Sequence, residues 1–104
     1  MAQFDLFSNP IHTARAAYPY VVVLQSDVTS GNADHIVAPV VERVGLGPIA
    51  GRLMPTVSVG GLEFVVLVPA LTGMPRRALA QPLQTLEAHR AELLAAIDLF
   101  FFGI

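Results

Sequence analysis

The sequence has no cysteine and no lysine, and charged side chains make up only 13% of its 104 residues. Without cysteine, the chain can form no disulfide, thiol nucleophile or thiolate metal site, which is compatible with a reducing compartment. All six basic residues are arginines, and the formal net charge is −2. The arginines are scattered along the chain, so we expect no basic patch of the kind that binds nucleic acid directly.

Long apolar runs are missing too, because the longest falls well short of the ~18–20 residues that span a bilayer. No membrane partner is therefore expected. The first five residues lack the charged segment and apolar core of a signal peptide, which predicts a cytoplasmic protein. The length predicts a single domain covering residues 1–104. Since average globular chains contain roughly 25% charged residues, this chain has few polar groups to cover its surface, and self-association is expected.

Alternating and β-branched segments predict a mainly β fold. Strands are expected at residues 3–7, 18–24, 35–41, 55–59 and 62–68, with a further short extended piece within 69–82. Gly60-Gly61 separates two of these strands, and paired glycines permit the positive φ angles of a tight hairpin turn. The strand after this turn is apolar on both faces and is expected inside the sheet. Pro39 cannot donate a ladder hydrogen bond, which favours an edge or a bulge for its strand.

Near residue 85 the apolar period changes to that of a helix. Apolar residues that share one helical face are Leu86, Leu93, Leu94, Ile97 and Phe101. Thr85 is the predicted N-cap, and Gly103 the predicted glycine that ends the helix. This face is expected to dock on the sheet.

Three consecutive phenylalanines, Phe100, Phe101 and Phe102, stand at the end of this helix. Successive helical residues point about 100° apart, so the three rings cannot all face one core. At least one of them, Phe102 by its position, is predicted to remain outside the core. Exposed aromatic area is typical of protein interfaces. The pattern thus predicts an interface at the helix end without identifying the partner.

No arrangement of residues typical of catalysis is found. His12, His35 and His89 lie in three different expected elements, and none has a second ligand at metal-binding spacing. The glycines at 45, 47 and 51 lack the strand, spacing and helix of a dinucleotide-binding motif. Ser26-Asp27 has no positioned third group for nucleophilic catalysis. We therefore expect no enzyme activity, no metal and no cofactor.

Several segments together resemble the CcdB family, the toxin half of the CcdA/CcdB toxin–antitoxin pair. The resemblance extends over essentially the whole chain, in matching order and length. Its most specific part is the aromatic helix end closed by Gly103-Ile104, together with Gln-Ser-Asp at the right separation. The matching segments are Gln3-Phe4, Gln25-Ser26-Asp27, Val37-Ala38-Pro39-Val40, Pro55 to Gly60, Met74-Pro75 and Ala96 to Ile104.

The resemblance implies an SH3-like barrel of antiparallel strands with a small second sheet and one C-terminal helix, a fold shared with MazF-like toxins. It also implies a homodimer whose paired helix ends insert into the A subunit of DNA gyrase and trap the cleaved gyrase–DNA complex. Such a topoisomerase poison is not an enzyme. A CcdA-like antitoxin would neutralise it through a disordered arm, and the toxin–antitoxin complex would repress its own operon, so that DNA is contacted only indirectly.

Site residues follow from the resemblance, position by position for the gyrase-binding set and only by region for the antitoxin-binding set. The gyrase-binding residues are Val28, Thr29, Asp98, Phe102, Gly103 and Ile104. The dimer interface contains Phe101, Phe102 and Gly103. The antitoxin-binding residues are Ser8, Asn9, His12, Arg15, Gly60 and Gly61. Phe102 and Asp98 depart from the best-known family member, which has tryptophan and asparagine at these positions.

Two alternatives remain open at this point. The chain could be an antitoxin-binding protein with the toxin fold that no longer poisons gyrase, which the departures at Phe102 and Asp98 leave possible. It could also be a MazF-like endoribonuclease. That activity needs a basic groove, and this acidic chain shows no cluster of basic residues that would form one.

Overall fold

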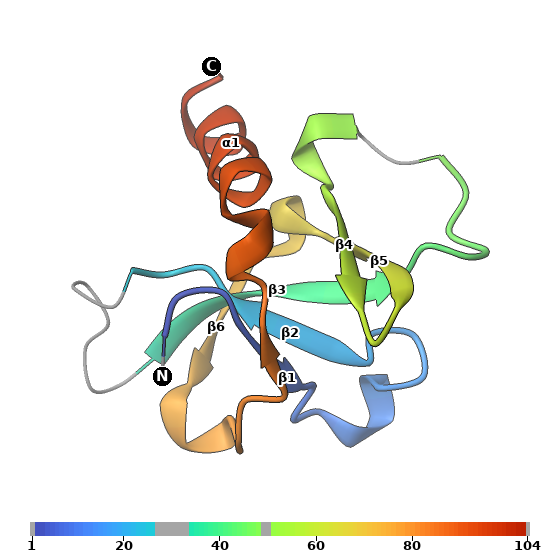
Figure 1. The fold of residues 1–104 in the computed structure, drawn as a ribbon. Helices are drawn as coiled ribbons and strands as arrows, with labels where there is room; N and C mark the ends of the chain where they lie inside the picture. The colour runs from blue at the N-terminus through green and yellow to red at the C-terminus, as the bar shows by residue number, and fades with distance from the viewer. Residues whose placement is uncertain (1, 27–33, 49–50, 104) are drawn as a thin grey trace.

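The computed structural model describes residues 2–26, 34–48 and 51–103, which form a curled antiparallel sheet with one α-helix, α1 (Arg90–Phe102) (Figure 1). This arrangement confirms the expected mainly β fold with a C-terminal helix. The strands are β1 (Asp5–Ser8), β2 (Tyr20–Val23), β3 (Asp34–Glu42), β4 (Thr56–Val59), β5 (Leu62–Val66), β6 (Thr72–Pro75) and β7 (Gln84–Thr85). Short 3₁₀ turns are η1 (His12–Ala14), η2 (Gly51–Leu53), η3 (Val68–Ala70), η4 (Arg76–Ala78) and η5 (Glu87–His89). In this part of the chain, no helix is both long and apolar enough to cross a membrane.

The seven strands follow the order β4-β5-β3-β2-β1-β7, and β6 branches from β3. The long strand β3 pairs with β2 on one side. On its other side, it pairs with β6 through its first residues and with β5 through its last. In the described residues, the small second sheet implied by the family resemblance is not separate, because β6 is joined to the main sheet through β3.

Pro39 lies in β3, an interior strand, so the expectation of an edge or bulge is wrong. The Pro39 carbonyl accepts from the Leu67 N–H at 2.9 Å, on the side of β3 that faces β5 and β6. A backbone N–H at position 39 would point to that side as well, between the segment of β3 that pairs with β6 and the segment that pairs with β5. A proline is tolerated there because the ladder is interrupted at that point.

The hairpin expected at Gly60-Gly61 is confirmed. Val57 and Val59 of β4 are buried, whereas Thr56 and Ser58 are exposed. Gly60 and Gly61 have φ angles of 59° and 83°, as a type I′ turn requires. β5 lies between β4 and β3, which agrees with the interior position expected for it.

The first strand begins at Asp5, two residues later than expected. Phe4 adopts a positive φ of 69° and its side chain is completely buried. Asp5 closes the preceding turn, since its N–H donates to the Ala2 carbonyl and its carboxylate accepts from the Ala2 N–H. The turn directs Phe4 into the core, which the alternating pattern of the segment does not reveal.

Both faces of the curled sheet are buried. The larger core lies between the sheet and α1, and includes Leu6, Val22, Val40, Leu86, Leu93 and Ala96. The smaller core, on the opposite face, contains Phe7, Val21, Val23, Val37, Met74 and Leu79. The two end strands of the sheet are linked by a side chain, because Gln84 Nε2 of β7 donates to the Ser58 carbonyl of β4 at 3.3 Å. This contact brings the sheet close to a barrel.

The helix begins later than the sequence predicts. Thr85 belongs to β7, and its hydroxyl accepts from the Glu87 N–H at 3.1 Å, so it stabilises the turn η5 rather than capping α1. Leu86 is fully buried but precedes the helix, and its N–H donates to the Phe4 carbonyl at 2.8 Å. This hydrogen bond holds the segment as an extension of the sheet until residue 86. Gly103 ends the helix in the left-handed conformation, as predicted.

Candidate partner-binding surface at the helix end

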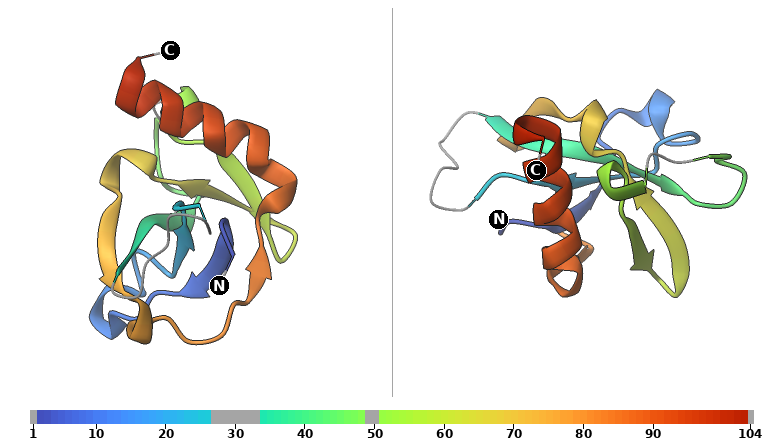
Figure 2. Two further views of the ribbon diagram at one scale, coloured as in Figure 1. Left: turned by 90° about the vertical axis from the view of Figure 1, so that its left-hand side faces the viewer. Right: turned by 90° about the horizontal axis from the view of Figure 1, so that it is seen from above.

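The carboxyl-terminal turn of α1 projects beyond the sheet (Figures 1 and 2). Leu93 and Ala96 are completely buried, but the exposed fractions of Phe100, Phe101 and Phe102 rise along the chain from 40% to 58% and 73%. Phe102 therefore lies outside the core, as predicted. Phe101 was expected to face the core, and this expectation is wrong, because the sheet ends before it reaches the last turn of the helix.

The three rings contact one another in sequence. The centroids of Phe100 and Phe101 are 5.2 Å apart in an edge-to-face arrangement, and those of Phe101 and Phe102 are 6.4 Å apart. Such aromatic contacts stabilise a preferred arrangement of the rings. The Gly103 N–H donates to the Leu99 carbonyl at 2.9 Å and closes the turn that carries them. The helix end is thus an ordered aromatic surface.

An apolar groove of about 190 Å³ adjoins this surface. Phe101 and Ile97 of α1 form one wall, and Leu24, Gln25, Ile36 and Leu71 complete the lining. Ile36 is 37% exposed, which is high for an isoleucine inside a sheet strand. Sequence reasoning missed Leu24, Ile36 and Leu71 as members of this surface. The sequence contains only a weak indication of this surface. Ile36, Ala38 and Val40 alternate along one face of β3, but the neighbouring residues do not show that α1 leaves Ile36 uncovered.

The structure places the residues predicted to bind gyrase as follows. Asp98 is exposed on α1, one helical turn before Phe102, and Gly103 is exposed at the helix end. Val28, Thr29 and Ile104 lie outside the described residues. Gln25, which precedes the Val28 segment, lines the same groove as Phe101. The structure therefore places Gln25 beside the helix end.

The residues predicted to bind an antitoxin fall in two separate places. Ser8, His12 and Arg15 lie in and around η1, whereas Gly60 and Gly61 form the tip of the β4–β5 hairpin. The two views of Figure 2 show that η1 and the hairpin tip lie far apart.

Asn9 is only 4% exposed, and its side chain holds the loop that carries the neighbouring residues. Its amide nitrogen donates to the Tyr18 carbonyl and its amide oxygen accepts from the Ile11 N–H, both at 2.9 Å. The Asn9 carbonyl also accepts from Arg15 Nε. Asn9 thus fixes the loop, and the exposed side chains around it are the ones a partner would meet.

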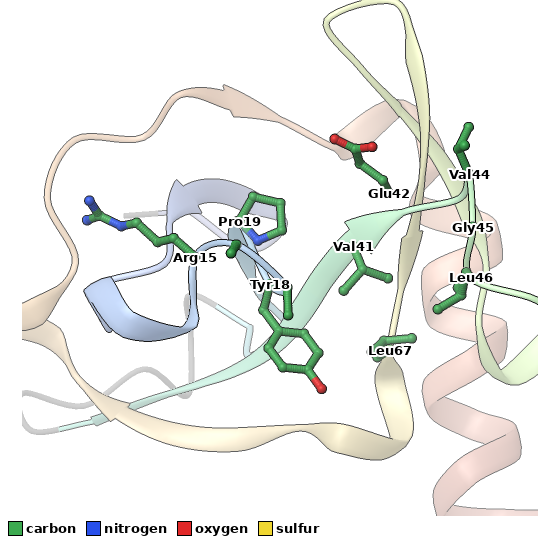
Figure 3. A pocket seen from close by; sticks show the side chains of 11 residues that line it. Arg15, Tyr18, Pro19, Val41, Glu42, Val44, Gly45, Leu46 and Leu67 are labelled. Atoms are coloured by element: carbon green, nitrogen blue, oxygen red, sulfur yellow. The ribbon is translucent and has the colours of Figure 1, made fainter.

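A second hollow, of about 490 Å³, lies beside Arg15 (Figure 3). Tyr18 and Pro19 line one side, and Val41 at the end of β3 and Leu46 in the following loop line the other. Figure 3 shows the Tyr18 ring near Val41 and Leu67, with the guanidinium of Arg15 pointing away from them. This hollow borders the loop predicted to meet an antitoxin.

The three histidines have different surroundings. His12 is exposed, and His89 Nε2 accepts from the Ser58 N–H at 3.3 Å. His35 is 2% exposed, and neither of its ring nitrogens has a hydrogen-bond partner among the described residues. Burial lowers the pKa of His35, and the positive charge of Arg76 lowers it further. Among residues 2–26, 34–48 and 51–103, no three histidine, aspartate or glutamate side chains are grouped to hold a metal ion.

Comparison with known proteins agrees with this geometry. The family model described as CcdB protein matches residues 3–103. No curated protein sequence matches the chain significantly. The family match extends from the first turn, before β1, through the sheet to Gly103 at the end of α1. The chain therefore belongs to the CcdB family, the toxins of toxin–antitoxin systems.

Proposed function

We propose that this protein is the toxin of a type II toxin–antitoxin system and poisons DNA gyrase through the end of α1. It would bind the A subunit of gyrase as a homodimer and trap the cleaved gyrase–DNA complex. The proposed contact residues are Val28, Thr29, Asp98, Phe102, Gly103 and Ile104. The poison acts by binding, so the protein itself catalyses no reaction.

The observation that carries this proposal is the exposed aromatic helix end. Phe102 is 73% exposed, so most of its ring area is available to a partner. Buried aromatic side chains supply much of the binding energy of protein interfaces. A phenylalanine face also accepts a cation such as an arginine guanidinium. Asp98 is exposed four residues before Phe102 and so lies on the same side of the helix.

The groove beside Phe101 supports the homodimer. Its lining is almost entirely apolar and includes Phe101, which we propose for the dimer interface together with Phe102 and Gly103. Contiguous apolar surface of this kind favours association with another protein surface. The scarcity of charged residues in the chain favours self-association further.

The separated antitoxin residues support an extended antitoxin. A disordered arm that folds on binding can follow a long surface and so contact both η1 and the hairpin tip. We propose that such a CcdA-like arm neutralises the toxin and that the complex represses its operon. DNA would be contacted through the antitoxin alone.

A second candidate function is supported by two particular residues. Phenylalanine at position 102 and aspartate at position 98 stand where the best-known family member has tryptophan and asparagine. Phenylalanine offers less contact area and no indole N–H, and the aspartate adds a negative charge. A protein that still binds its antitoxin but no longer poisons gyrase would fit these substitutions.

Expression of the protein in cells that carry its natural host's gyrase separates the candidates. Growth arrest with accumulated gyrase–DNA cleavage complexes is the expected result. Arrest with degraded RNA and unaffected gyrase would indicate a ribonuclease instead. Unchanged growth, with antitoxin binding retained, would indicate the inactive binding protein.

Truncation of Gly103-Ile104 tests the site itself. We expect the truncated protein to lose toxicity while it keeps its fold and binds the antitoxin, measured by circular dichroism and titration calorimetry. Leu83→Ala is a matched control, because Leu83 is also an exposed apolar residue, at 55% exposure, before β7 rather than in α1. If the truncated protein unfolds, the helix end belongs to the core and the proposal is wrong.

A further inference from the structure

His35 is buried on the face of the sheet opposite α1. In β3, His35 and Val37 are buried, whereas Asp34 and Ile36 are exposed. Val37 belongs to the smaller core, and a side chain two residues earlier in a strand points to the same face. The His35 side chain is 2% exposed, and neither ring nitrogen has a hydrogen-bond partner among the described residues. The ring therefore lies in surroundings that favour its neutral form.

The strand beside His35 is short and attached on one side. Within the described chain, β6 pairs with β3 alone, and Met74 stands opposite His35. The Leu24 N–H, just after β2, donates to the Ile36 carbonyl at 2.9 Å, so the backbone groups of Ile36 face β2. The adjacent residue of an antiparallel strand faces the other way, so the backbone groups of His35 face Met74. Because β6 has only four residues, its separation from β3 breaks few hydrogen bonds.

β6 and η4 form part of the cover of the smaller core, and β6 runs away from α1 toward η4 (Figure 1). Met74 in β6 and Leu79, directly after η4, belong to this core and are buried. The α1 residues Leu93 and Ala96 belong to the larger core on the other face. Movement of β6 and η4 away from β3 would therefore open the smaller core at His35 and leave the packing between α1 and the sheet in place.

Fixed contacts lie at both ends of this segment. Leu71, directly before β6, packs against the larger core, and the Leu83 N–H donates to the Leu6 carbonyl at 2.7 Å. Residues 72–82 lie between these contacts, and their one strand with more than two residues, β6, pairs only with β3 in the described chain. Segments with few attachments open locally at a lower free energy than the whole fold.

The charges that act on His35 come from β3, η4 and the amino terminus. Burial lowers the pKa of His35, the positive charges of Arg76 and of the amino terminus lower it further, and Asp34 raises it. β2 and β6, the strands beside this part of β3, carry no charged side chain. Tyr20 of β2 packs against the larger core, and Asp5 of β1 is separated from β3 by β2. A protonated His35 ring would thus be a buried cation that Arg76 repels.

We propose that His35 is a pH-sensitive switch, whose protonation releases residues 72–82 from β3 while α1 and the other strands stay folded. Release lets water hydrate the charged ring, which is buried as long as β6 pairs with β3. This inference goes beyond the proposed function, because it concerns the face of the sheet opposite α1 and depends on no partner.

Amide hydrogen exchange of the purified full-length protein at about pH 7.5 and about pH 5 tests the switch. The Met74 N–H faces β3 and becomes accessible to water on release. In the released form His35 has an ordinary histidine pKa, so acid favours that form. The protection factor of Met74, which corrects for the intrinsic pH dependence of exchange, should fall at least about threefold and at most about thirtyfold. An unchanged protection factor at Met74 would overturn the proposal.

Low, non-denaturing urea distinguishes local release from global unfolding. Urea favours an open state in proportion to the surface that the state exposes. Exchange at Met74 should therefore depend weakly on urea. The amide of Ala96, buried in α1, should be better protected and depend on urea strongly. If both amides depended on urea equally, β6 would open only with the whole fold, and the proposal would be wrong.

Two exposed arginines in η4 provide matched variants. Arg76→Gln removes a charge that opposes protonation of His35, so the acid-induced fall in Met74 protection should become smaller. Arg77→Gln removes the neighbouring charge and should leave this fall unchanged. His35→Leu should abolish the fall, and the two arginine variants keep the test decisive if His35→Leu fails to fold. Equal effects of Arg76→Gln and Arg77→Gln would refute the proposed switch.

Discussion

The two ends of α1 are held in opposite ways. Near its start, polar side chains form hydrogen bonds with distant segments. His89 accepts from the Ser58 N–H, and Arg90 donates to Gln3 Oε1 at 3.2 Å. The Arg90 guanidinium also lies 5.6 Å from the centre of the Phe4 ring. At its end, the exposed fractions of three phenylalanines rise from 40% to 73%, and their aromatic ring contacts within the described chain are with one another. Polar contacts and the buried residues Leu93 and Ala96 therefore hold the first part of the helix on the sheet, while the apolar residues at its end are left for a partner.

This contrast shows that hydrophobicity by itself does not decide which residues stabilise the fold. Leu93 and Phe102 are both large and apolar and lie on the same helix, yet their exposed fractions are 0% and 73%. Transfer of apolar area from water stabilises the fold only at Leu93, the buried residue. The exposed Phe102 side chain contributes little to the folding stability of the monomer and is available for binding.

The largest effect is expected for Leu93→Ala in the buried half of the helix. Removal of the side chain leaves a cavity between α1 and the sheet, and such changes cost about 2–5 kcal/mol of unfolding free energy. Urea unfolding monitored by circular dichroism measures the loss. If Leu93→Ala destabilised the protein by less than about 1 kcal/mol, the helix would not be anchored through this residue.

An intermediate loss of unfolding free energy is expected when the pH is lowered, because His35 is buried without a hydrogen-bond partner among the described residues. His35 differs from His89 because its ring has no hydrogen-bond partner among the described residues, and burial followed by the charge of Arg76 lowers its pKa below the usual 6.5. The unfolded chain therefore binds a proton at a pH where the folded chain does not, so stability falls as pH drops below about 6.5. Each unit by which the pKa is lowered corresponds to about 1.4 kcal/mol once the pH lies below both pKa values.

Urea unfolding at about pH 5 and about pH 7.5 measures this dependence. The variant His35→Leu should flatten the profile between these pH values. His12→Gln is the matched control, because His12 is exposed and its replacement should leave the profile unchanged. A wild-type protein that is equally stable at both pH values would contradict the expected role of His35.

The smallest effect on stability is expected for Phe102→Ala at the free end. Because the ring is mostly in solvent, the unfolding free energy of the monomer should change by less than about 0.5 kcal/mol. The same substitution should weaken self-association, measured by sedimentation velocity. A loss of stability comparable to that of Leu93→Ala would remove the contrast between the two ends of the helix.

Local patterns predicted much of the fold. Alternation or a run of β-branched residues identified the strands that became β2, β3, β4 and β5, and Gly60-Gly61 identified the hairpin because only residues that tolerate positive φ fit that turn. The segment ending at Gly103 was predicted as helix from its apolar period. Phe4 and Leu86 were misplaced, because hydrogen bonds to distant segments decide their conformation.

The candidate site was predicted less completely. The angular spacing of helical residues was enough to place Phe102 outside the core, but it did not show that Phe100 and Phe101 are exposed as well. Leu24, Ile36 and Leu71 come from three separate segments and meet only in the folded chain.

The amino-acid sequence by itself determined where the strands, the tight turn and the helical segment lie, because these depend on side-chain periodicity and on the backbone freedom of nearby residues. Only the tertiary structure decided that Pro39 is tolerated inside the sheet, that His35 is buried, and that the aromatic end of α1 extends beyond the sheet. Burial and pairing depend on which distant segments meet. The extent of the sheet beneath α1 therefore determines which apolar residues form the core and which remain free to bind.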